Sequence, residues 1–414
     1  MIYWLPLLAG LLVACSGGER FLALHEPVTP TARRATATLA PTFTHSPTAT
    51  LTPTATPPPS ATPEPSATPR PSATLRPSAT PTVAATATVA ATSTAEPTAT
   101  AAAVVAATAR QVLLPNISHD YQRLNNCGPT TAAMTLSYYG FGLTQYDIAP
   151  LVKGADTDKN VAPEDLTAYL RSQGFAAPIR VNGDLEMLRA LLSNGIPVIV
   201  EQWLERPDDA LTGHYRLVRG YDQDAGVFVV NDSYLGPNLR YPDATFDRWW
   251  RAFNRLYIPV YRAEQEPLVR AIVGESVWET EAMWRSAVGR AEQELAAAPD
   301  LYGWFNLGTA RLRLGDVGGS VEAFDRALAI GLPERMLWYQ FALFEAFNAA
   351  GQYARTIELS ELYVGLKIEE IHYQRGIALE GLGQAQAALA EYQAAVAFNA
   401  RYGPALEAAR RLSG

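Results

Sequence analysis

Cys127 is one of only two cysteines in a chain of 414 residues. Because the other, Cys15, lies more than a hundred positions away, a disulfide framework is not expected. Gly128 and Pro129 favour a turn directly after Cys127, and residues 130–139 form an apolar run typical of a buried helix. Cys127 is therefore expected at a helix N-terminus, where unpaired N–H groups and the helix dipole favour a nucleophilic thiolate. The alternative is a buried structural cysteine that only begins a helix.

A thiolate nucleophile needs a base, and the base needs a third group to orient it. The chain has five histidines. His25 and His45 lie in a Thr/Pro-rich tract, and His372 lies in a helical repeat. His119 and His214 remain as candidates for the base.

Two apolar segments are expected to form adjacent antiparallel strands, residues 213–222 and 227–232. His214 opens the first strand, and Asn231-Asp232 closes the second. This pairing brings His214 near the end of the second strand, where Asp232 can accept from the imidazole. The alternatives are a half-buried strand histidine bonded to a backbone carbonyl, and an aspartate that only caps a turn.

These segments, with the run Asn-Asn-Cys-Gly-Pro-Thr-Thr at 125–131, resemble the papain-like cysteine peptidases that include the double-glycine leader peptidases of bacteriocin exporters, in particular the stand-alone members. The similarity covers about residues 109–262. It implies that Cys127 is the nucleophile and His214 the general base. It further implies that Asp232 orients His214 and that the side-chain amide of Gln122 donates to the oxyanion. A preorganised amide donor of this kind is worth a few kcal/mol.

Two positions depart from the family pattern. Gln122 stands five positions before Cys127, one position fewer than is common in the family, and Ser233 stands where a proline is expected after Asp232. Asn231 is a second candidate orienter, since papain itself uses asparagine. Alternation along a strand points Asn231 and Asp232 to opposite faces, so only one of them can serve. The motif favours Asp232.

The resemblance implies an α+β papain-like domain, with helices first and a sheet later. The local pattern agrees, and about 150 residues is ample for one core. Helices are expected at 130–139, 163–173, 184–193 and 246–253, and strands at 196–203, 213–222, 227–232 and 256–261.

The N-terminal sequence predicts the cellular location of the protein. An apolar run ends in Leu-Val-Ala-Cys at 12–15 and resembles the lipobox of bacterial lipoproteins, so residues 1–15 are interpreted as a lipoprotein signal and Cys15 as the lipidated residue. The run is too short to span a bilayer, for which about 20 apolar residues are needed. It lacks the basic start typical of signal peptides. The alternative is a short buried segment.

Residues 16–108 are dominated by Thr, Pro, Ala and Ser and are expected to form a disordered stalk. Signal and stalk together predict an extracytoplasmic, membrane-anchored lipoprotein exposed on a bacterial surface, with membrane contact through the lipid alone. The alternative is a low-complexity linker without an anchoring role.

Residues 270–414 carry a repeat. Thirty-four residues separate Trp304 from Trp338 and Trp338 from His372, and small residues recur at the same period. The pattern resembles the tetratricopeptide repeat, so an all-α solenoid is expected. Such stacks form concave surfaces that bind peptides or partner proteins, and the alternative is a structural spacer.

Composition narrows the function. The net charge is −8, with Lys+Arg 33 against Asp+Glu 41 and no basic stripe, so nucleic-acid binding is not expected. The scattered histidines and cysteines predict no metal and no cofactor.

Three hypotheses remain. The first is a surface-anchored cysteine peptidase acting on a peptide or protein, with a repeat domain for a protein partner. The second is an acyl transferase or side-chain amidase with the same thiol chemistry. The third is a catalytically silent peptide-binding lipoprotein. The presence of every matched catalytic residue type favours the first.

Overall fold

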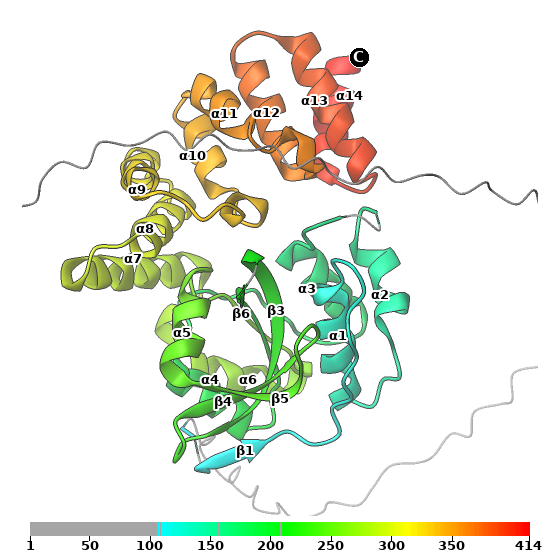
Figure 1. Ribbon diagram of the computed structural model, residues 1–414, viewed down its shortest axis with the longest axis vertical. Helices are drawn as coiled ribbons and strands as arrows, with labels where there is room; N and C mark the ends of the chain where they lie inside the picture. Colours follow the sequence, from blue (N-terminus) through cyan, green and yellow to red (C-terminus); the bar gives the residue numbers. More distant parts are fainter. Residues whose placement is uncertain (1–105, 108, 156–157, 208) are drawn as a thin grey trace, which may run out of the picture. The chain divides into compact units, whose positions relative to one another are not determined.

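The computed structural model describes residues 106–107, 109–155, 158–207 and 209–414, all of which fall in one compact unit (Figure 1). The expected signal at 1–15, the lipidation site Cys15 and nearly all of the stalk at 16–108 lie outside the described residues. Within the described part of the chain, no helix has both the length and the apolar character needed to cross a membrane.

The first described region is an antiparallel sheet with helices on both faces. Its strands run in the order β5-β4-β3-β2-β6, and β1 pairs with β3. β3 is the long central strand, and it passes so close to β1 that a side chain at Gly220 would meet the Val112 carbonyl oxygen. The strands are β1 (Gln111–Leu113), β2 (Val198–Arg206), β3 (Asp209–Asp222), β4 (Val227–Asp232), β5 (Gly236–Pro242) and β6 (Tyr257–Pro259).

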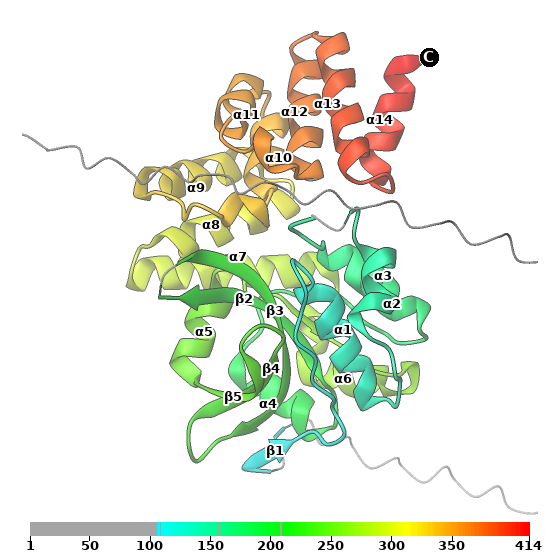
Figure 2. The ribbon, with the colours of Figure 1, turned by 45° about the vertical axis from the view of Figure 1, so that its right-hand side comes forward.

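Two helical layers cover the sheet, and the alternation of β2 explains why both faces are apolar (Figure 2). Ile199 packs in one core with α1, α2 and α3, whereas Val198 and Val200 pack in a second core with α4, α5 and α6. These helices are α1 (Cys127–Tyr138), α2 (Gln145–Val152), α3 (Pro163–Ser172), α4 (Leu185–Ser193), α5 (Asp243–Arg251) and α6 (Glu266–Val273).

α1 begins at Cys127, as the sequence predicts, and lies almost entirely buried. Two of its buried threonines donate to backbone carbonyls: Thr131 to Tyr215 at 3.2 Å, and Thr135 to Thr131 at 2.7 Å. The first of these bonds ties the start of α1 to β3 at Tyr215, directly after His214.

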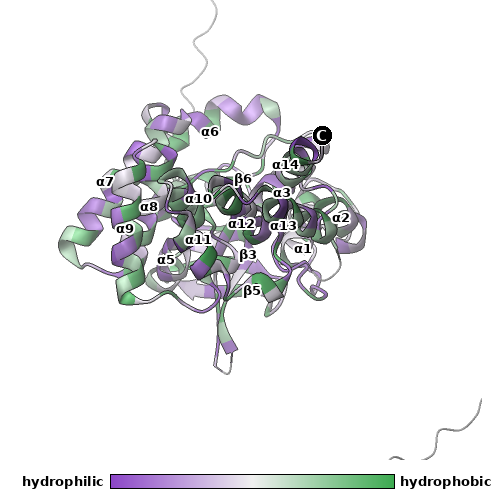
Figure 3. Ribbon diagram, turned by 90° about the horizontal axis from the view of Figure 1, so that it is seen from above, coloured by the Kyte–Doolittle hydropathy of each residue, from purple (hydrophilic) through white to green (hydrophobic). Residues whose placement is uncertain are grey.

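The C-terminal region is helical. Contacts join α7 with α8, α8 with α9, α10 with α11, α12 with α13, and α13 with α14. Hydrophobic and hydrophilic stretches alternate along α7, α8 and α9, as expected of helices that bury one side (Figure 3). The helices are α7 (Thr280–Ala297), α8 (Leu301–Arg313), α9 (Val317–Ile330), α10 (Ala342–Ala349), α11 (Tyr353–Ser360), α12 (Glu369–Gly381), α13 (Ala385–Phe398) and α14 (Gly403–Ser413).

Small residues of the predicted repeat lie where neighbouring helices meet. A Cβ at Gly308 would lie 2.9 Å from the Phe324 ring, and one at Gly376 would lie 2.3 Å from the Tyr392 ring. The middle copy differs from its neighbours, because Trp338 ends a short 3-10 helix, η3 (Met336–Trp338), and α10 begins only at Ala342. The α+β region followed by a helical region agrees with expectation, and the tetratricopeptide assignment stays a prediction.

The two regions share a core at the end of the β2–β3 hairpin. Trp203 of β2 is buried against Phe253 and Tyr339, and its indole N–H donates to the Tyr302 hydroxyl at 3.0 Å. Arg335 forms an ion pair with Asp209 at 2.7 Å. The segment that interrupts the middle repeat therefore packs on the sheet, beside the strand that carries His214.

Candidate active site

Cys127 is half-buried at the first position of α1. Burial alone raises the pKa of its thiol. The hydrogen bond and charge of His214, with the backbone N–H groups of Tyr215 and Gly128, more than offset burial and lower the pKa below its usual value. The fold thus favours the thiolate.

His214 lies near the middle of β3 with 2% of its surface exposed. Its Nε2 bonds to Asp232 Oδ1 at 2.9 Å, which leaves Nδ1 for the hydrogen bond with Cys127. Burial lowers the pKa of His214, but Asp232 and Cys127 together raise it to about 9. Both pKa shifts favour a thiolate beside an imidazolium.

Asp232 ends β4 and is fully buried. Its carboxylate accepts from His214, from Arg216 Nε at 2.7 Å, and from the backbone N–H groups of Tyr234 at 2.8 Å and Leu235 at 2.9 Å. Burial raises the pKa of Asp232, but its two cationic partners and the Leu235 N–H hold it well below the usual range. Asp232 is a permanent anion.

Arg216 is a site residue that the sequence reasoning missed. It is fully buried and lies directly across from Asp232 in the β3–β4 register. Its Nη1 donates to Gln202 Oε1 and to the Trp203 carbonyl, both at 3.1 Å, and its guanidinium faces the Trp249 ring at 5.2 Å. The sequence signal that could have identified Arg216 is its position: it stands two residues after His214, on the same strand face and opposite Asp232.

Asn231 points to the other face of β4, as alternation requires. Its Oδ1 accepts from the Asn238 N–H at 3.1 Å, and it does not contact His214. The structure therefore brings Asp232, and not Asn231, to the imidazole.

Gln122 is fixed by Ser233, the residue that stands in place of the family proline. The Gln122 N–H donates to the Ser233 carbonyl at 2.8 Å, and the Ser233 hydroxyl donates to Gln122 Oε1 at 2.8 Å. Since the serine occupies the amide oxygen, the amide Nε2 is the end left to donate to another group.

His119, the other candidate base, lies close to the site but is engaged elsewhere. Its Nε2 donates to the backbone carbonyl of Asp232 at 3.0 Å, and its ring packs edge-on against Tyr121. His119 therefore braces the end of β4, whereas His214 bonds the thiol.

Residues 110–258 match the model of the Peptidase_C39 like family. This match supports a cysteine peptidase domain in that part of the chain. No curated protein matches the chain.

Solved structures with similarity to the chain include three peptidases. A C39-like peptidase from Bacillus anthracis is 17% identical, with 37% of this chain and 98% of that chain covered and a TM-score of 0.31. The peptidase domain of Streptococcus ComA, a bi-functional ABC transporter, is 17% identical, with 35% and 98% covered and a TM-score of 0.28. A double glycine motif protease from an AMS/PCAT transporter, solved with its leader peptide, is 18% identical, with 37% and 99% covered and a TM-score of 0.28.

The ion pair predicts unusual thiol reactivity. Iodoacetamide should alkylate Cys127 rapidly at neutral pH, well below the pH of about 8.5 at which a free thiol titrates. His214→Ala should shift the pH dependence of the alkylation rate to higher pH, whereas His119→Ala should leave it unchanged. The rate of carbamidomethylation at Cys127, followed by mass spectrometry across pH, measures this. A wild-type rate that rises only near pH 8.5 would contradict the ion pair.

Proposed function

We propose that residues 109–262 form a cysteine peptidase that hydrolyses peptide bonds through Cys127, His214 and Asp232. The observation that carries the proposal is the buried imidazole of His214, which bonds the Asp232 carboxylate at 2.9 Å and is close enough to Cys127 to lower the pKa of its thiol. The family match over residues 110–258 supports it. A catalytically silent domain would need none of these pKa shifts.

In the acylation step the Cys127 thiolate adds to the substrate carbonyl carbon and forms a C–S bond. The imidazolium of His214 then gives its proton to the leaving amine as the C–N bond breaks. The products are a thioester and a free amine. In the second step neutral His214 takes a proton from water, the hydroxide adds to the thioester, and the carboxylic acid leaves with the thiolate restored. An amine in place of water would give the acyl transfer of the second hypothesis.

Gln122 is proposed to stabilise the oxyanion formed in both steps. This proposal is supported by the bond from the Ser233 hydroxyl to the Gln122 amide oxygen, which leaves Nε2 as the end that can donate. The positive end of the α1 helix dipole adds positive potential at the same place.

The N-terminal sequence supports a further proposal about location: Cys15 carries a lipid, and the stalk holds the peptidase and its repeats away from the membrane at the bacterial surface. The tetratricopeptide-like period at 270–414 supports a peptide or protein partner for the helical region.

The roles of the three catalytic residues can be tested through the pH profile. Cys127→Ala should abolish hydrolysis of a peptide library. Asp232→Asn removes the anion that raises the pKa of His214, so the basic limb of kcat/KM should move down by at least about one pH unit. Asn231→Ala is the matched control, and its profile should keep the wild-type limbs.

If the basic limb of kcat/KM is unchanged in Asp232→Asn, Asp232 does not orient His214. If that limb shifts in Asn231→Ala, the orienting role passes to Asn231. Hydrolysis that survives Cys127→Ala would end the peptidase proposal.

The oxyanion role predicts a loss confined to the chemical step. Gln122→Ala should lower kcat by about 10²- to 10³-fold with little change in KM. Ser233→Ala should give a smaller loss in the same direction, because the amide is then free to rotate. Ser172→Ala serves as control, because the Ser172 hydroxyl donates to the Tyr169 carbonyl at 2.7 Å and accepts from the Gln173 amide at 3.2 Å, both within its own helix end. A Gln122→Ala enzyme with full kcat would exclude the role.

The location proposal predicts that the mature protein partitions with membranes and carries lipid on Cys15. Cys15→Ala should release the protein to the soluble fraction or leave it unprocessed. Mass spectrometry of the N-terminal peptide after membrane fractionation measures both. Soluble wild-type protein with residues 1–14 intact would refute the proposal.

A further inference from the structure

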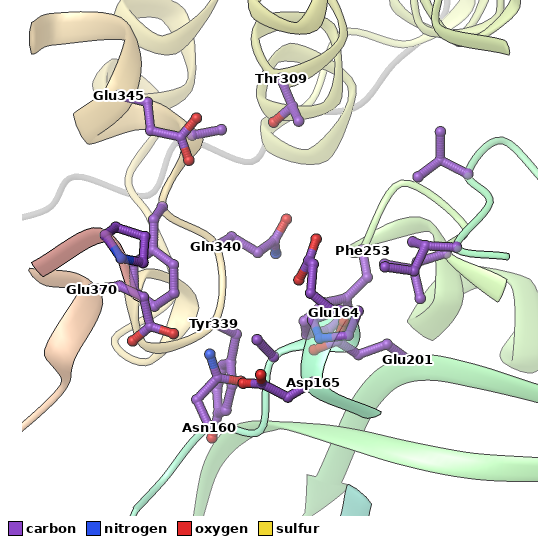
Figure 4. A pocket seen from close by; sticks show the side chains of 18 of the residues that line it. Asn160, Glu164, Asp165, Glu201, Phe253, Thr309, Tyr339, Gln340, Glu345 and Glu370 are labelled. Atoms are coloured by element: carbon purple, nitrogen blue, oxygen red, sulfur yellow. The ribbon is translucent and has the colours of Figure 1, made fainter. Parts of the chain in front are cut away.

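A cavity of about 530 Å³ lies where the peptidase region meets the helical region. Figure 4 shows Glu164, Asp165 and Glu201 on the peptidase side and Glu345 and Glu370 on the other. The peptidase side is formed by the start of α3 and the middle of β2. The helical side includes the interrupted segment before α10, side chains of α7, α8, α10 and α12, and the residues around Arg401 at the start of α14.

Glu201 lines this cavity with a buried carboxyl group that does not stabilise the fold. It stands in the middle of β2, a strand whose other residues from Val198 to Leu204 are buried, and it is itself only 5% exposed. Its carboxyl group lines the cavity, and among the described residues no hydrogen bond or ion pair holds it. A buried carboxyl without a partner costs stability, so its presence points to a ligand.

The rest of the lining is also short of positive charge. Five carboxyl side chains line the cavity against two guanidinium groups, and both guanidiniums are engaged. Arg313 is paired with Glu345, and Arg401 donates to backbone carbonyls of Pro150 and Lys153. Glu370 Oε2 is buried and has no hydrogen-bond partner. The lining therefore holds more acid groups than basic partners for them.

The cavity adjoins the nucleophile. Glu201 pairs with Tyr215 in the β2–β3 register, and the Tyr215 N–H donates to the Cys127 sulfur. The Tyr339 ring, which also lines the cavity, packs within 2.8 Å of where a Cβ on Gly213 would lie. Gly213 directly precedes His214. Two residues that line the cavity, Glu201 and Tyr339, are therefore next to residues that adjoin Cys127 and His214.

We propose that this cavity is a specificity pocket for a lysine or arginine side chain of the peptide substrate, with Glu201 as the counter-charge. The inference rests on the proposed peptidase function and names its substrate class. The aliphatic stem of such a side chain packs against Phe253, Ile179 and Tyr339, and its charged end reaches the carboxyl groups.

Two observations agree with an organic cation. Burial, with the negative charges of Cys127 and Glu164, raises the pKa of Glu201 well above its usual value. A cation placed at this carboxyl group acts in the opposite direction, because it stabilises the ionised form. In the described part of the chain, no three His, Cys, Asp or Glu side chains are grouped so that they could hold a metal ion.

The test is a binding measurement on the full chain with Cys127→Ala, so that no chemistry is needed. The probes are six alanine hexapeptides that carry one lysine at each position in turn, with the norleucine and glutamate analogues of each. Calorimetry should give at least about tenfold tighter binding for lysine than for norleucine at one position or more, and weaker binding for glutamate.

Glu201→Gln in the same background should reduce the lysine preference to about twofold or less, because the amide keeps the shape and loses the charge. Glu205→Gln is the matched control: it removes an exposed carboxylate of the same strand that pairs with Arg248, and it should keep the full preference. No lysine preference at any position, or a preference that survives Glu201→Gln, would overturn the pocket.

Hydrolysis by the wild type separates this inference from the proposed function. Lysine-selective binding without hydrolysis of any peptide would refute the peptidase while supporting the pocket. Hydrolysis with equal kcat/KM for lysine and norleucine peptides would support the peptidase and overturn the pocket.

Discussion

The site depends on one set of interactions, the bonds from His214 and Arg216 to the buried carboxylate of Asp232. Asp232 lies at the end of β4, where the strand register puts it across from Arg216 and within reach of His214. Two backbone N–H groups complete its shell. A buried anion with this many charge-assisted bonds stays ionised at every physiological pH, and a permanent anion is what keeps His214 protonated beside the thiol. Removing this carboxylate would leave Arg216 as an uncompensated charge in the core. Asp232 therefore stabilises both the site and the pairing of β3 with β4.

The sequence predicted much of this arrangement because several signals are local. The turn residues after Cys127 and the apolar run that follows indicate α1, and period-two alternation separates Asn231 from Asp232. The α+β region followed by helices agrees with what these patterns indicate. The catalytic roles of Cys127, His214, Asp232 and Gln122 stay predictions.

Two features were beyond local reasoning. Arg216 sits in an apolar strand where a charge is unexpected, and its meaning depends on a strand partner sixteen positions later. The break before α10 is invisible to a 34-residue period, because what interrupts the helix is the packing of Tyr339 on Gly213 and Trp203 in the other region. Both features come from tertiary contacts that override the local pattern. The segment at this break, Tyr339 to Phe341, lines the cavity between the two regions.

The most direct measurement of the central claim is the protonation of His214 itself. In protein labelled with ¹⁵N histidine, nuclear magnetic resonance distinguishes an imidazolium from either neutral tautomer. Both ring nitrogens of His214 should carry protons at pH 7, and the ring should become neutral only near pH 9. A neutral imidazole at pH 7, titrating near the ordinary histidine value of about 6.5, would contradict the thiolate–imidazolium pair and the role assigned to Asp232.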